Sequence, residues 1–224
     1  LFRSIQAIKN GASYVISDNP AISKKSDKII YVDNSIKALQ KLANYHRRKL
    51  NTKIIAITGS NGKTTSKELI LNVLKTKYKT TATKGNLNNH LGVPLSLLEI
   101  NENTEFSIIE MGANHLNEIS QLCKITEPNF GYITNFGNAH LEGFGGIEGV
   151  IKGKTELYKH LLKEEQKVFI NTNDSLQVAH STKIDSINFG ETTQLKSIDP
   201  FLLVGYKDLE IQTNLIGEYN FSNI

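Results

Sequence analysis

Residues 54–65 read Ile54-Ile-Ala-Ile-Thr-Gly59-Ser-Asn-Gly62-Lys63-Thr64-Thr65, and this stretch decides the fold. The β-branched apolar run predicts a buried strand, a glycine turn follows, and a helix begins near the Lys-Thr pair. Backbone N–H groups in such a turn point at an anion, and the helix N-terminus adds partial positive charge. We therefore expect a phosphate-binding loop. The alternative is a strand–helix turn that uses its glycines only for geometry.

The side chains of this loop suit a nucleotide. We expect Lys63 to neutralise the β- and γ-phosphates and the Thr64 hydroxyl to bind Mg²⁺. The loop is shorter than the usual P-loop, because only Ser60 and Asn61 separate the first glycine from the Gly-Lys pair. The expected nucleotide-binding residues are Gly59, Ser60, Asn61, Gly62, Lys63, Thr64 and Thr65.

Around this loop, apolar runs alternate with amphipathic segments, which predicts an α/β fold: a mainly parallel sheet with helices on both faces. Expected strands are 54–57, 80–83, 106–110, 132–134 and 168–171, and expected helices are 65–77, 91–98, 117–124 and 147–162. The first fifty residues predict a smaller α/β unit, with strands at 14–17 and 29–32 between two helices, the second capped by Ser35. In the tail we expect antiparallel strands at 202–206 and 209–215, and the start of a helix near 217.

Composition excludes several classes of protein. The 224 residues carry 26 Lys+Arg and 22 Asp+Glu, with 39% hydrophobic residues, which is an ordinary globular balance. No apolar run approaches the ~20 residues of a membrane span, and the first residues do not resemble a signal peptide. The single Cys123 excludes an intrachain disulfide and fits a reducing compartment, the cytoplasm. Basic residues are scattered, so we expect no nucleic-acid partner.

Two further residues are candidate metal ligands. Glu110 ends the predicted strand 106–110, and the carboxyl end of a parallel strand faces the ligand crevice. Its carboxylate is a suitable Mg²⁺ ligand, although a helix-capping or salt-bridged glutamate remains the alternative. His140 lies in a glycine-rich loop after strand 132–134. A loop histidine is usually a surface residue, but its place after the next strand favours the same site.

Several segments, taken in order, resemble the muramyl (Mur) ligases. They are TGSNGKTT (58–65), GNLNNHLGVP (85–94), IIEMGANH (108–115), ITNFGNAHLEGFG (133–145), GVIKGKTEL (149–157) and GEYN (217–220). Within that family the resemblance is to ligases that add D-alanyl-D-alanine to UDP-N-acetylmuramoyl-tripeptide. It implies an ATP- and Mg²⁺-dependent amide ligase of peptidoglycan synthesis that forms an acyl phosphate.

Other interpretations remain open. Another Mur ligase is one, and a folylpolyglutamate synthase is a second, although those enzymes typically have glycine where this chain has Thr64. A nucleotide-binding module without activity is a third. The resemblance also implies an internal fragment that is itself inactive: residues 1–50 would end the UDP-sugar domain, 51–224 would be most of the ATP-binding domain, and the C-terminal domain would be absent. We expect a monomer.

The resemblance assigns roles to particular residues. Lys63, His140 and Lys154 are implied as catalytic, with Thr64, Glu110, His140 and Lys154 at the metal. Lys154 is implied to be carbamylated, with Lys152 as the competing position. Asn86, Asn88, Asn89 and His115 are implied to face the muramoyl substrate, although loop 86–90 and His115 also suit helix capping. Asn220 and Asn223 are implied to face adenine, with Tyr219 replacing the usual histidine. Residues 171–174 resemble a nucleotide-side loop or a plain turn.

Overall fold

The computed structural model describes residues 2–137 and 141–224. Its helices are α1 (Phe2–Lys9), α2 (Pro20–Ser23), α3 (Ser35–Lys49), α4 (Lys63–Lys75), α5 (Gly92–Leu98), α6 (Glu118–Thr126), α7 (Leu141–Phe144), α8 (Ile147–Lys154), α9 (Glu156–Lys163), α10 (Ser175–Ser181) and the 3₁₀ helix η1 (Glu218–Asn223). Its strands are β1 (Val15–Ser17), β2 (Ile29–Tyr31), β3 (Lys53–Thr58), β4 (Thr80–Ala82), β5 (Phe106–Glu110), β6 (Phe130–Ile133), β7 (Lys167–Asn171), β8 (Ser186–Phe189), β9 (Thr193–Ser197), β10 (Leu203–Tyr206) and β11 (Leu209–Gln212).

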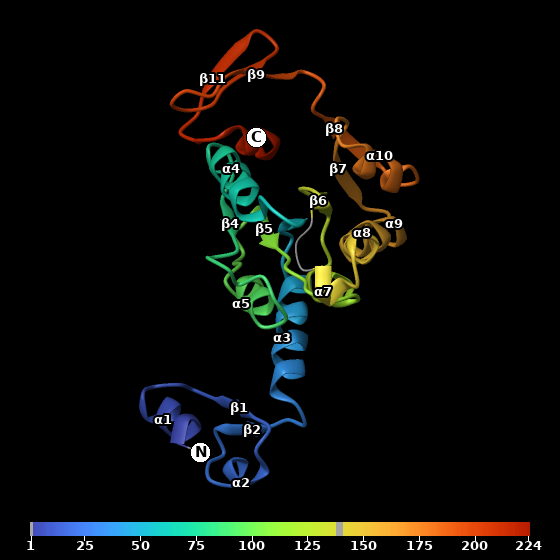
Figure 1. The fold of residues 1–224 in the computed structure, drawn as a ribbon. Coiled ribbons are helices and arrows are strands. Elements are labelled where there is room, and N and C mark those ends of the chain that lie inside the picture. The colour runs from blue at the N-terminus through green and yellow to red at the C-terminus, as the bar shows by residue number, and fades with distance from the viewer. Residues whose placement is uncertain (1, 138–140) are drawn as a thin grey trace.

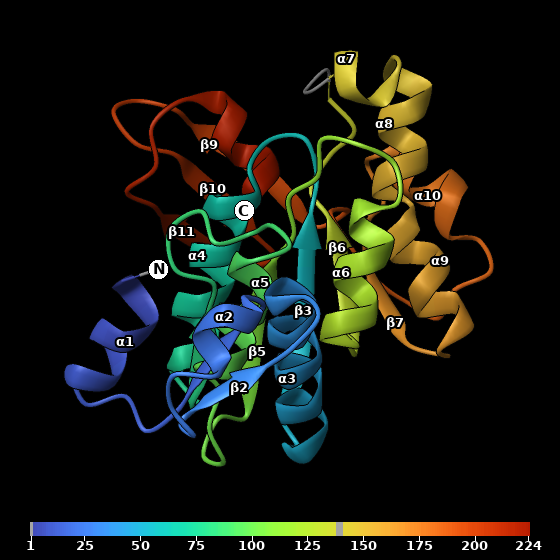
Figure 2. The same ribbon diagram turned by 90° about the horizontal axis from the view of Figure 1, so that it is seen from below.

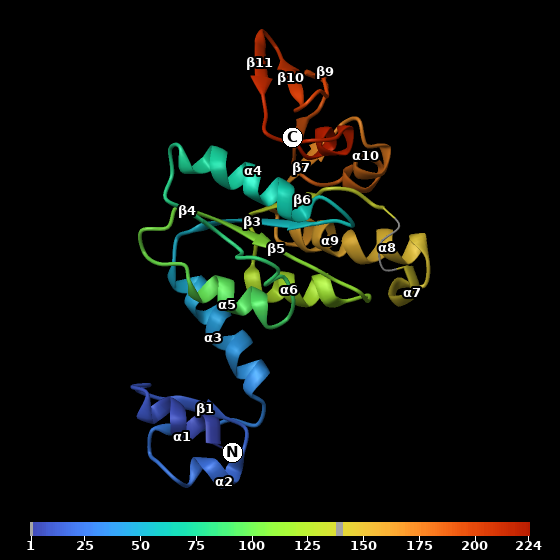
Figure 3. The ribbon, with the colours of Figure 1, turned by 60° about the vertical axis from the view of Figure 1, so that its left-hand side comes forward.

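The centre of the molecule is a six-stranded sheet in the order β4-β5-β3-β6-β7-β8, and every neighbouring pair is parallel. Figure 2 shows β3 in the middle, between β5 and β6. Helices cover both faces, with α4 on one side and α5 and α6 on the other (Figure 3). The predicted α/β class is therefore confirmed.

Alternation along β3 builds two cores, one on each face of the sheet. Ile54 and Ala56 belong to the larger core with residues of α3, α5, α6 and α9, whereas Ile55 and Ile57 pack with Leu71 of α4. All four strand residues are buried. Because side chains of a strand point alternately to opposite faces, a continuous apolar run is what a doubly covered strand requires.

The first thirty-odd residues form a small unit in which β1 and β2 pair in parallel, next to α1 and α2 (Figure 1), and α3 leads from it to the central sheet. Ser35 was expected to cap the long helix, but the cap is Asn34, whose side chain accepts a hydrogen bond from the Lys37 N–H at 2.8 Å. Ser35 begins the helix, and its hydroxyl donates to the Asp18 carboxylate at 2.8 Å. The predicted domain boundary, 50/51, falls in the turn between α3 and β3.

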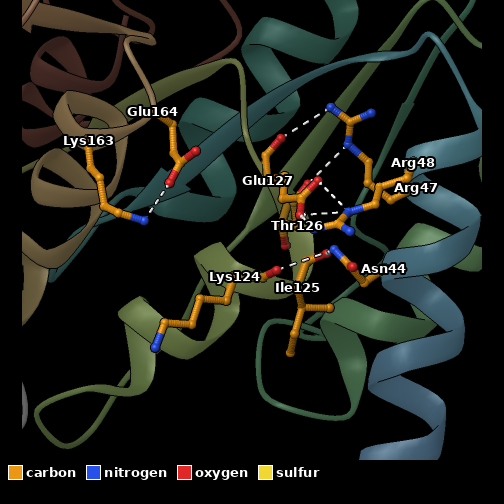
Figure 4. A network of polar contacts seen from close by, with 9 residues as sticks. All are labelled: Asn44, Arg47, Arg48, Lys124, Ile125, Thr126, Glu127, Lys163 and Glu164. Carbon is orange, nitrogen blue, oxygen red and sulfur yellow. Dashed lines mark hydrogen bonds and ion pairs between the residues drawn. The ribbon is translucent and has the colours of Figure 1, made fainter.

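A network of polar contacts joins α3 to the C-terminal end of α6, at the edge of the sheet where the strands begin (Figure 4). Arg47 donates to the carbonyls of Thr126 at 3.0 Å and Glu127 at 3.1 Å, and Asn44 donates to the carbonyl of Ile125 at 2.9 Å. The last carbonyls of a helix have no partner within it, so these donors satisfy them. We call this network the α3–α6 joint.

Other predicted elements differ from the structure as well. The single helix expected at 147–162 is divided into α8 and α9 at Thr155, whose hydroxyl bonds back to the carbonyl of Ile151 at 2.8 Å, a contact that bends helices. The tail contains the expected antiparallel pair, β10 and β11, but β9 adds a third strand on the other side of β10. None of the helices in the described ranges is long and apolar enough to cross a membrane.

Candidate functional site

The candidate site lies at the carboxyl edge of the central sheet, where the loops after β3, β5 and β6 meet. A cavity of about 500 Å³ opens there between the phosphate loop, loop 86–90 and α6. Its lining includes Lys63, Asn86, Asn88, Asn89, Ala113 and Glu118. In a parallel α/β sheet this edge is the place where ligands bind.

The phosphate loop has the backbone that its glycines permit. Gly59 and Gly62 adopt φ of +142° and +76°, in the range that residues with a side chain rarely adopt. A Cβ at Gly59 would overlap the Thr134 hydroxyl, and one at Gly62 would overlap the Asn223 side chain. The Lys63 ammonium donates to the Gly59 and Ser60 carbonyls at 2.8 and 3.1 Å. Burial lowers the Lys63 pKa, and nearby Glu110 opposes that shift.

The segment after β6, residues 134–137, holds this loop through hydrogen bonds, a role that the sequence analysis did not predict. The Asn135 side chain accepts from the Asn61 N–H at 3.1 Å and donates to the Asn61 carbonyl at 3.0 Å. The Thr134 hydroxyl also donates to that carbonyl, and the Ser60 hydroxyl donates to the Gly137 carbonyl at 2.7 Å. The only sequence signal was position, since Asn135 comes directly after a strand of the same sheet.

Glu110 is buried at the end of β5 and contacts two of the predicted site residues. One carboxylate oxygen accepts from the Thr64 hydroxyl at 3.0 Å, and the other accepts from the Asn88 amide at 2.9 Å. The structure therefore brings together a hydroxyl, a carboxylate and an amide beside the Lys63 ammonium. Within residues 2–137 and 141–224, no three His, Cys, Asp or Glu side chains cluster as a metal cage would need.

That donor set fits Mg²⁺ bound with a nucleotide. Mg²⁺ is usually held by one or two protein oxygens together with waters and phosphate oxygens, rather than by an all-protein cage. Thr64 and Glu110 are the residues that would supply those protein oxygens. His140, the other expected metal ligand, lies outside the described residues.

The predicted substrate residues divide into two groups. Asn86 is exposed and lines the cavity, as does Asn88. The Asn89 side chain lines it too, but its oxygen accepts from the N–H groups of Leu91 at 3.0 Å and Gly92 at 2.9 Å, at the start of α5. Asn89 thus has the helix-initiating role that the sequence also allowed.

The His115 side chain is exposed, and its backbone is held by a hydrogen bond. Its N–H donates to the Glu118 carboxylate at 3.1 Å, and its ring nitrogen Nδ1 lies 3.6 Å from the same group. Glu118 also accepts from the Asn114 N–H at 2.6 Å, so this carboxylate, which lines the cavity, holds the loop before α6. These backbone hydrogen bonds contribute to lowering the Glu118 pKa, although burial acts in the opposite direction.

Lys154 is almost fully buried, whereas its competitor Lys152 is exposed. The Lys154 ammonium lies 3.5 Å from the Ala113 carbonyl and 5.3 Å from the centre of the Phe144 ring. Burial, reinforced by the charge of Lys63, lowers the pKa of Lys154 to about 8. Two lysines from distant parts of the chain therefore share one electrostatic environment at this edge.

The tail reaches the phosphate loop through η1. The Asn223 amide donates to the Asn220 side-chain oxygen at 2.9 Å, and the Asn220 amide donates to the Ile216 carbonyl at 2.9 Å. Asn223 lies against Gly62, and its carbonyl accepts from the Ser66 hydroxyl at 3.4 Å. Tyr219 is largely exposed. The two expected adenine-facing residues are thus adjacent to the phosphate loop.

The turn after β7 is organised by a buried glutamine that sequence reasoning missed. Asp174 accepts from the N–H groups of Leu176 and Gln177 and caps α10, as a plain turn would. Gln177, which is fully buried, accepts from the Asn171 N–H at 3.0 Å and donates to Asp174 at 3.1 Å. Its amide also lies 3.4 Å from the Thr134 carbonyl, and so links this turn to the segment that grips the phosphate loop.

Together, the parallel sheet and the glycine loop that opens α4 define a phosphate-binding α/β domain of the P-loop type. Comparison with known proteins is more specific: residues 57–224 match the Mur ligase middle domain. The chain belongs to the Mur ligase family.

Two relatives from different bacteria have the same name. The chain is 37% identical over 186 residues to the UDP-N-acetylmuramoyl-tripeptide–D-alanyl-D-alanine ligase of Bacillus subtilis, covering 83% of this chain and 41% of that protein. It is 36% identical over 222 residues to the ligase of the same name from Rickettsia prowazekii, covering 97% of this chain and 48% of that protein. The chain thus spans about half the length of these relatives.

A solved structure agrees with these relatives. The MurF ligase of Thermotoga maritima, in complex with ADP, superposes with a TM-score of 0.82 at 31% identity, covering 98% of this chain and 53% of that one. The similarity extends over the small N-terminal unit as well as the central sheet.

Proposed function

We propose that the complete protein is an ATP-dependent ligase that joins D-alanyl-D-alanine to UDP-N-acetylmuramoyl-tripeptide, in the synthesis of peptidoglycan precursors. The observation that carries the proposal is the pairing of Thr64 with Glu110 beside Lys63, which lines the cavity. The names of the similar ligases, and the ADP in the Thermotoga structure, support the substrates.

In this proposal the phosphate loop binds ATP. The backbone N–H groups of residues 59–65 surround the phosphates, and Asn220 and Asn223 face the adenine. Thr64 and Glu110 hold Mg²⁺, together with His140 in the family's arrangement. Bound Mg²⁺ would neutralise negative charge on the phosphates.

The muramoyl substrate would enter the cavity between loop 86–90 and α6. Asn86 and Asn88 offer side-chain amides there, while Asn89 and His115 hold the ends of the loops that border it. Residues 1–50 are assigned to the end of the UDP-sugar-binding domain and 51–224 to the ATP-binding domain. The D-alanyl-D-alanine site is assigned to a C-terminal domain outside this chain. The protein is assigned to the cytoplasm, as a monomer.

The reaction would run in two steps. A carboxylate oxygen of the tripeptide attacks the γ-phosphorus of ATP, which forms an acyl phosphate and releases ADP. The amine of D-alanyl-D-alanine then attacks the activated carbonyl, loses a proton, and expels inorganic phosphate. Lys63 would stabilise the charge on the transferring phosphoryl group, and the rigid loop would keep the reacting atoms aligned.

Lys154 is assigned a carbamate. Its neutral amine would attack CO₂, form an N–C bond and release a proton, so that a cation becomes an anion that can contact Mg²⁺. The lowered pKa supports this reaction, because about a tenth of such amines are neutral at pH 7. Lys152, the competing position, is exposed.

The test is a reaction of the complete protein with ATP, UDP-N-acetylmuramoyl-tripeptide and D-alanyl-D-alanine. Formation of UDP-muramoyl-pentapeptide with equal amounts of ADP and phosphate is expected. Parallel reactions offer single amino acids with shorter UDP-muramoyl substrates, and glutamate with folate. Product only in one of those reactions would assign a different ligase. Tight ATP binding without any product would favour a nucleotide-binding module.

A further inference from the structure

Lys67 is a completely buried lysine to which the proposed mechanism gives no role. It lies on α4 three residues after Thr64 and four after Lys63, so it shares their side of the helix. An ammonium removed from water is costly unless it is well paired. Its contacts therefore show what its charge stabilises.

Two groups satisfy the Lys67 ammonium. It donates to the carbonyl of Thr83 at 2.7 Å and lies 3.0 Å from the carboxylate of Glu68. Glu68 is half exposed, whereas the contact with Thr83 is buried. The contact with Thr83 is the shorter of the two and is shielded from water, whereas water screens the pair with Glu68, so the contact with Thr83 is the stronger restraint.

Thr83 stands where strand β4 becomes the loop that borders the cavity. Its hydroxyl accepts from the Glu110 N–H at 3.0 Å, and its own N–H donates to the Ile108 carbonyl at 2.9 Å. Thr83 thus contacts α4 through Lys67, and it contacts the end of β5 through the backbone of Glu110.

The far end of the same loop returns to β5. The carbonyl of Asn88 accepts from the Gly112 N–H at 2.7 Å, and its side-chain amide donates to Glu110. The loop is therefore fixed at Thr83 and at Asn88, and Glu110 is contacted from both points. Lys67 connects the first of these points to the helix that begins at the phosphate loop.

We propose that Lys67 is a positioning residue that sets loop 83–90 relative to the phosphate-loop helix, and so tunes binding on the muramoyl-substrate side of the cavity. This inference rests on the proposed function. It predicts a selective effect, because Lys67 contacts the substrate loop, whereas the phosphate loop is held separately by Asn135 and Thr134.

The experiment replaces the ammonium by an apolar group of similar length, Lys67→Met, in the complete protein. We expect the KM for UDP-N-acetylmuramoyl-tripeptide to rise about tenfold, while the KM for ATP stays within about threefold of the parent. The matched control is Glu68→Gln, which removes the neighbouring exposed carboxylate and keeps the contact with Thr83. It should leave both KM values near those of the parent.

A double substitution tests whether Lys67 acts through loop 83–90. If Lys67 acts through the loop, Lys67→Met and Asn88→Ala combined should raise the KM for the muramoyl substrate by less than the product of their separate effects. A simple product would contradict this route. Should Lys67→Met not fold, Lys67→Gln keeps a polar donor but removes the charge, and should produce a rise of the same selectivity.

If the parent is active, equal rises in both KM values of Lys67→Met, or no change in either, would contradict the proposed role of Lys67. An inactive parent would instead contradict the proposed function, and the role of Lys67 with it. Thermal unfolding of each folded variant, measured beside the kinetics, separates a loss of fold from a loss of positioning.

Discussion

Basic residues gather at both ends of the central sheet, and the two groups differ in the charges that surround them. In the α3–α6 joint, Arg47 meets the carbonyls of Thr126 and Glu127 and the side-chain oxygen of Asn129. At the carboxyl edge, Lys63 and Lys154 lie close enough for the charge of one to lower the pKa of the other. At the joint a cation meets only hydrogen-bond acceptors, whereas at the carboxyl edge Lys63, although bonded to two carbonyls, also lies near a second cation.

This difference separates a structural use of charge from a functional one. A buried cation that meets helix carbonyls replaces its lost water and fixes two helices in register. Two cations placed near one another, Lys63 partly buried and Lys154 buried, destabilise each other until an anion arrives. The comparison therefore predicts that substitutions at the carboxyl edge change chemistry, whereas substitutions in the joint change stability.

The largest effect is expected for Lys63→Ala in the complete protein. Turnover should fall by roughly 10³-fold or more, because the charge that stabilises the transferring phosphoryl group is lost. Lys75→Ala, an exposed lysine at the other end of α4, is the matched control and should stay near the parent. A steady-state assay of phosphate release measures both. Equal rates for Lys63→Ala and the parent would show that this loop is not the catalytic one.

The next effect is expected for Lys154→Ala. If its carbamate holds the metal, activity should fall by roughly 10²-fold, and acetate should partly restore it by supplying the missing anion. Lys152→Ala should neither lose activity nor respond to acetate. Ligation rates of both variants, with and without acetate, decide between the two positions. Loss of activity in Lys152→Ala alone would transfer the role to that lysine.

Arg47→Met tests the other side of the comparison. It leaves the buried carbonyl of Thr126 and the partly buried carbonyls of Leu50 and Glu127 without this donor, so the free energy of unfolding should fall by about 2–4 kcal/mol. Arg48→Gln is the control, because the Arg48–Glu127 pair is largely exposed and its loss should have little effect. Urea denaturation measures both. A change in the KM for ATP at unchanged stability would contradict the assignment of the joint.

A smaller effect should appear in the pH dependence of stability. The pKa of Lys154 is about 8 when folded, below its unfolded value of 10.5, so the unfolded state binds more protons between these values. In CO₂-free buffer the free energy of unfolding should therefore rise across this window, by about 2 kcal/mol more for the parent than for Lys154→Met. Denaturation of both proteins at pH 7.5 and pH 10 measures the difference. Identical profiles would show that Lys154 titrates normally.

Local patterns were enough to predict the central sheet and the residues at the ends of its strands. The run 54–65 predicts its strand, turn and helix, because each is encoded by adjacent residues. Glu110 was predictable as the last residue of an apolar strand, and the structure places it against Thr64. The division at Thr155 was not predictable from periodicity, since one hydroxyl back-bond interrupts a pattern that otherwise continues.

Residues that act by holding others were missed. Asn135, Gln177 and Lys67 each contact backbone groups that are distant in sequence, and their neighbours carry no pattern that marks such contacts. Strand β8 was missed because it is exposed and at the edge of the sheet, so it lacks an apolar run. Two residues in loops that the resemblance assigns to ligands make local contacts instead. Asn89 and Asp174 each accept hydrogen bonds from the first N–H groups of the helix that follows.

The most direct test of the account is calorimetric titration of Mg-ATP into the complete protein and two variants, Lys63→Ala and Arg48→Gln. Both variants remove one basic group, the first from the carboxyl edge and the second from the α3–α6 joint. We predict that ATP binds the parent and Arg48→Gln with the same affinity, and binds Lys63→Ala at least about tenfold more weakly. Equal affinity for the parent and Lys63→Ala, or weakened binding to Arg48→Gln alone, would contradict the assignment of the carboxyl edge as the nucleotide site.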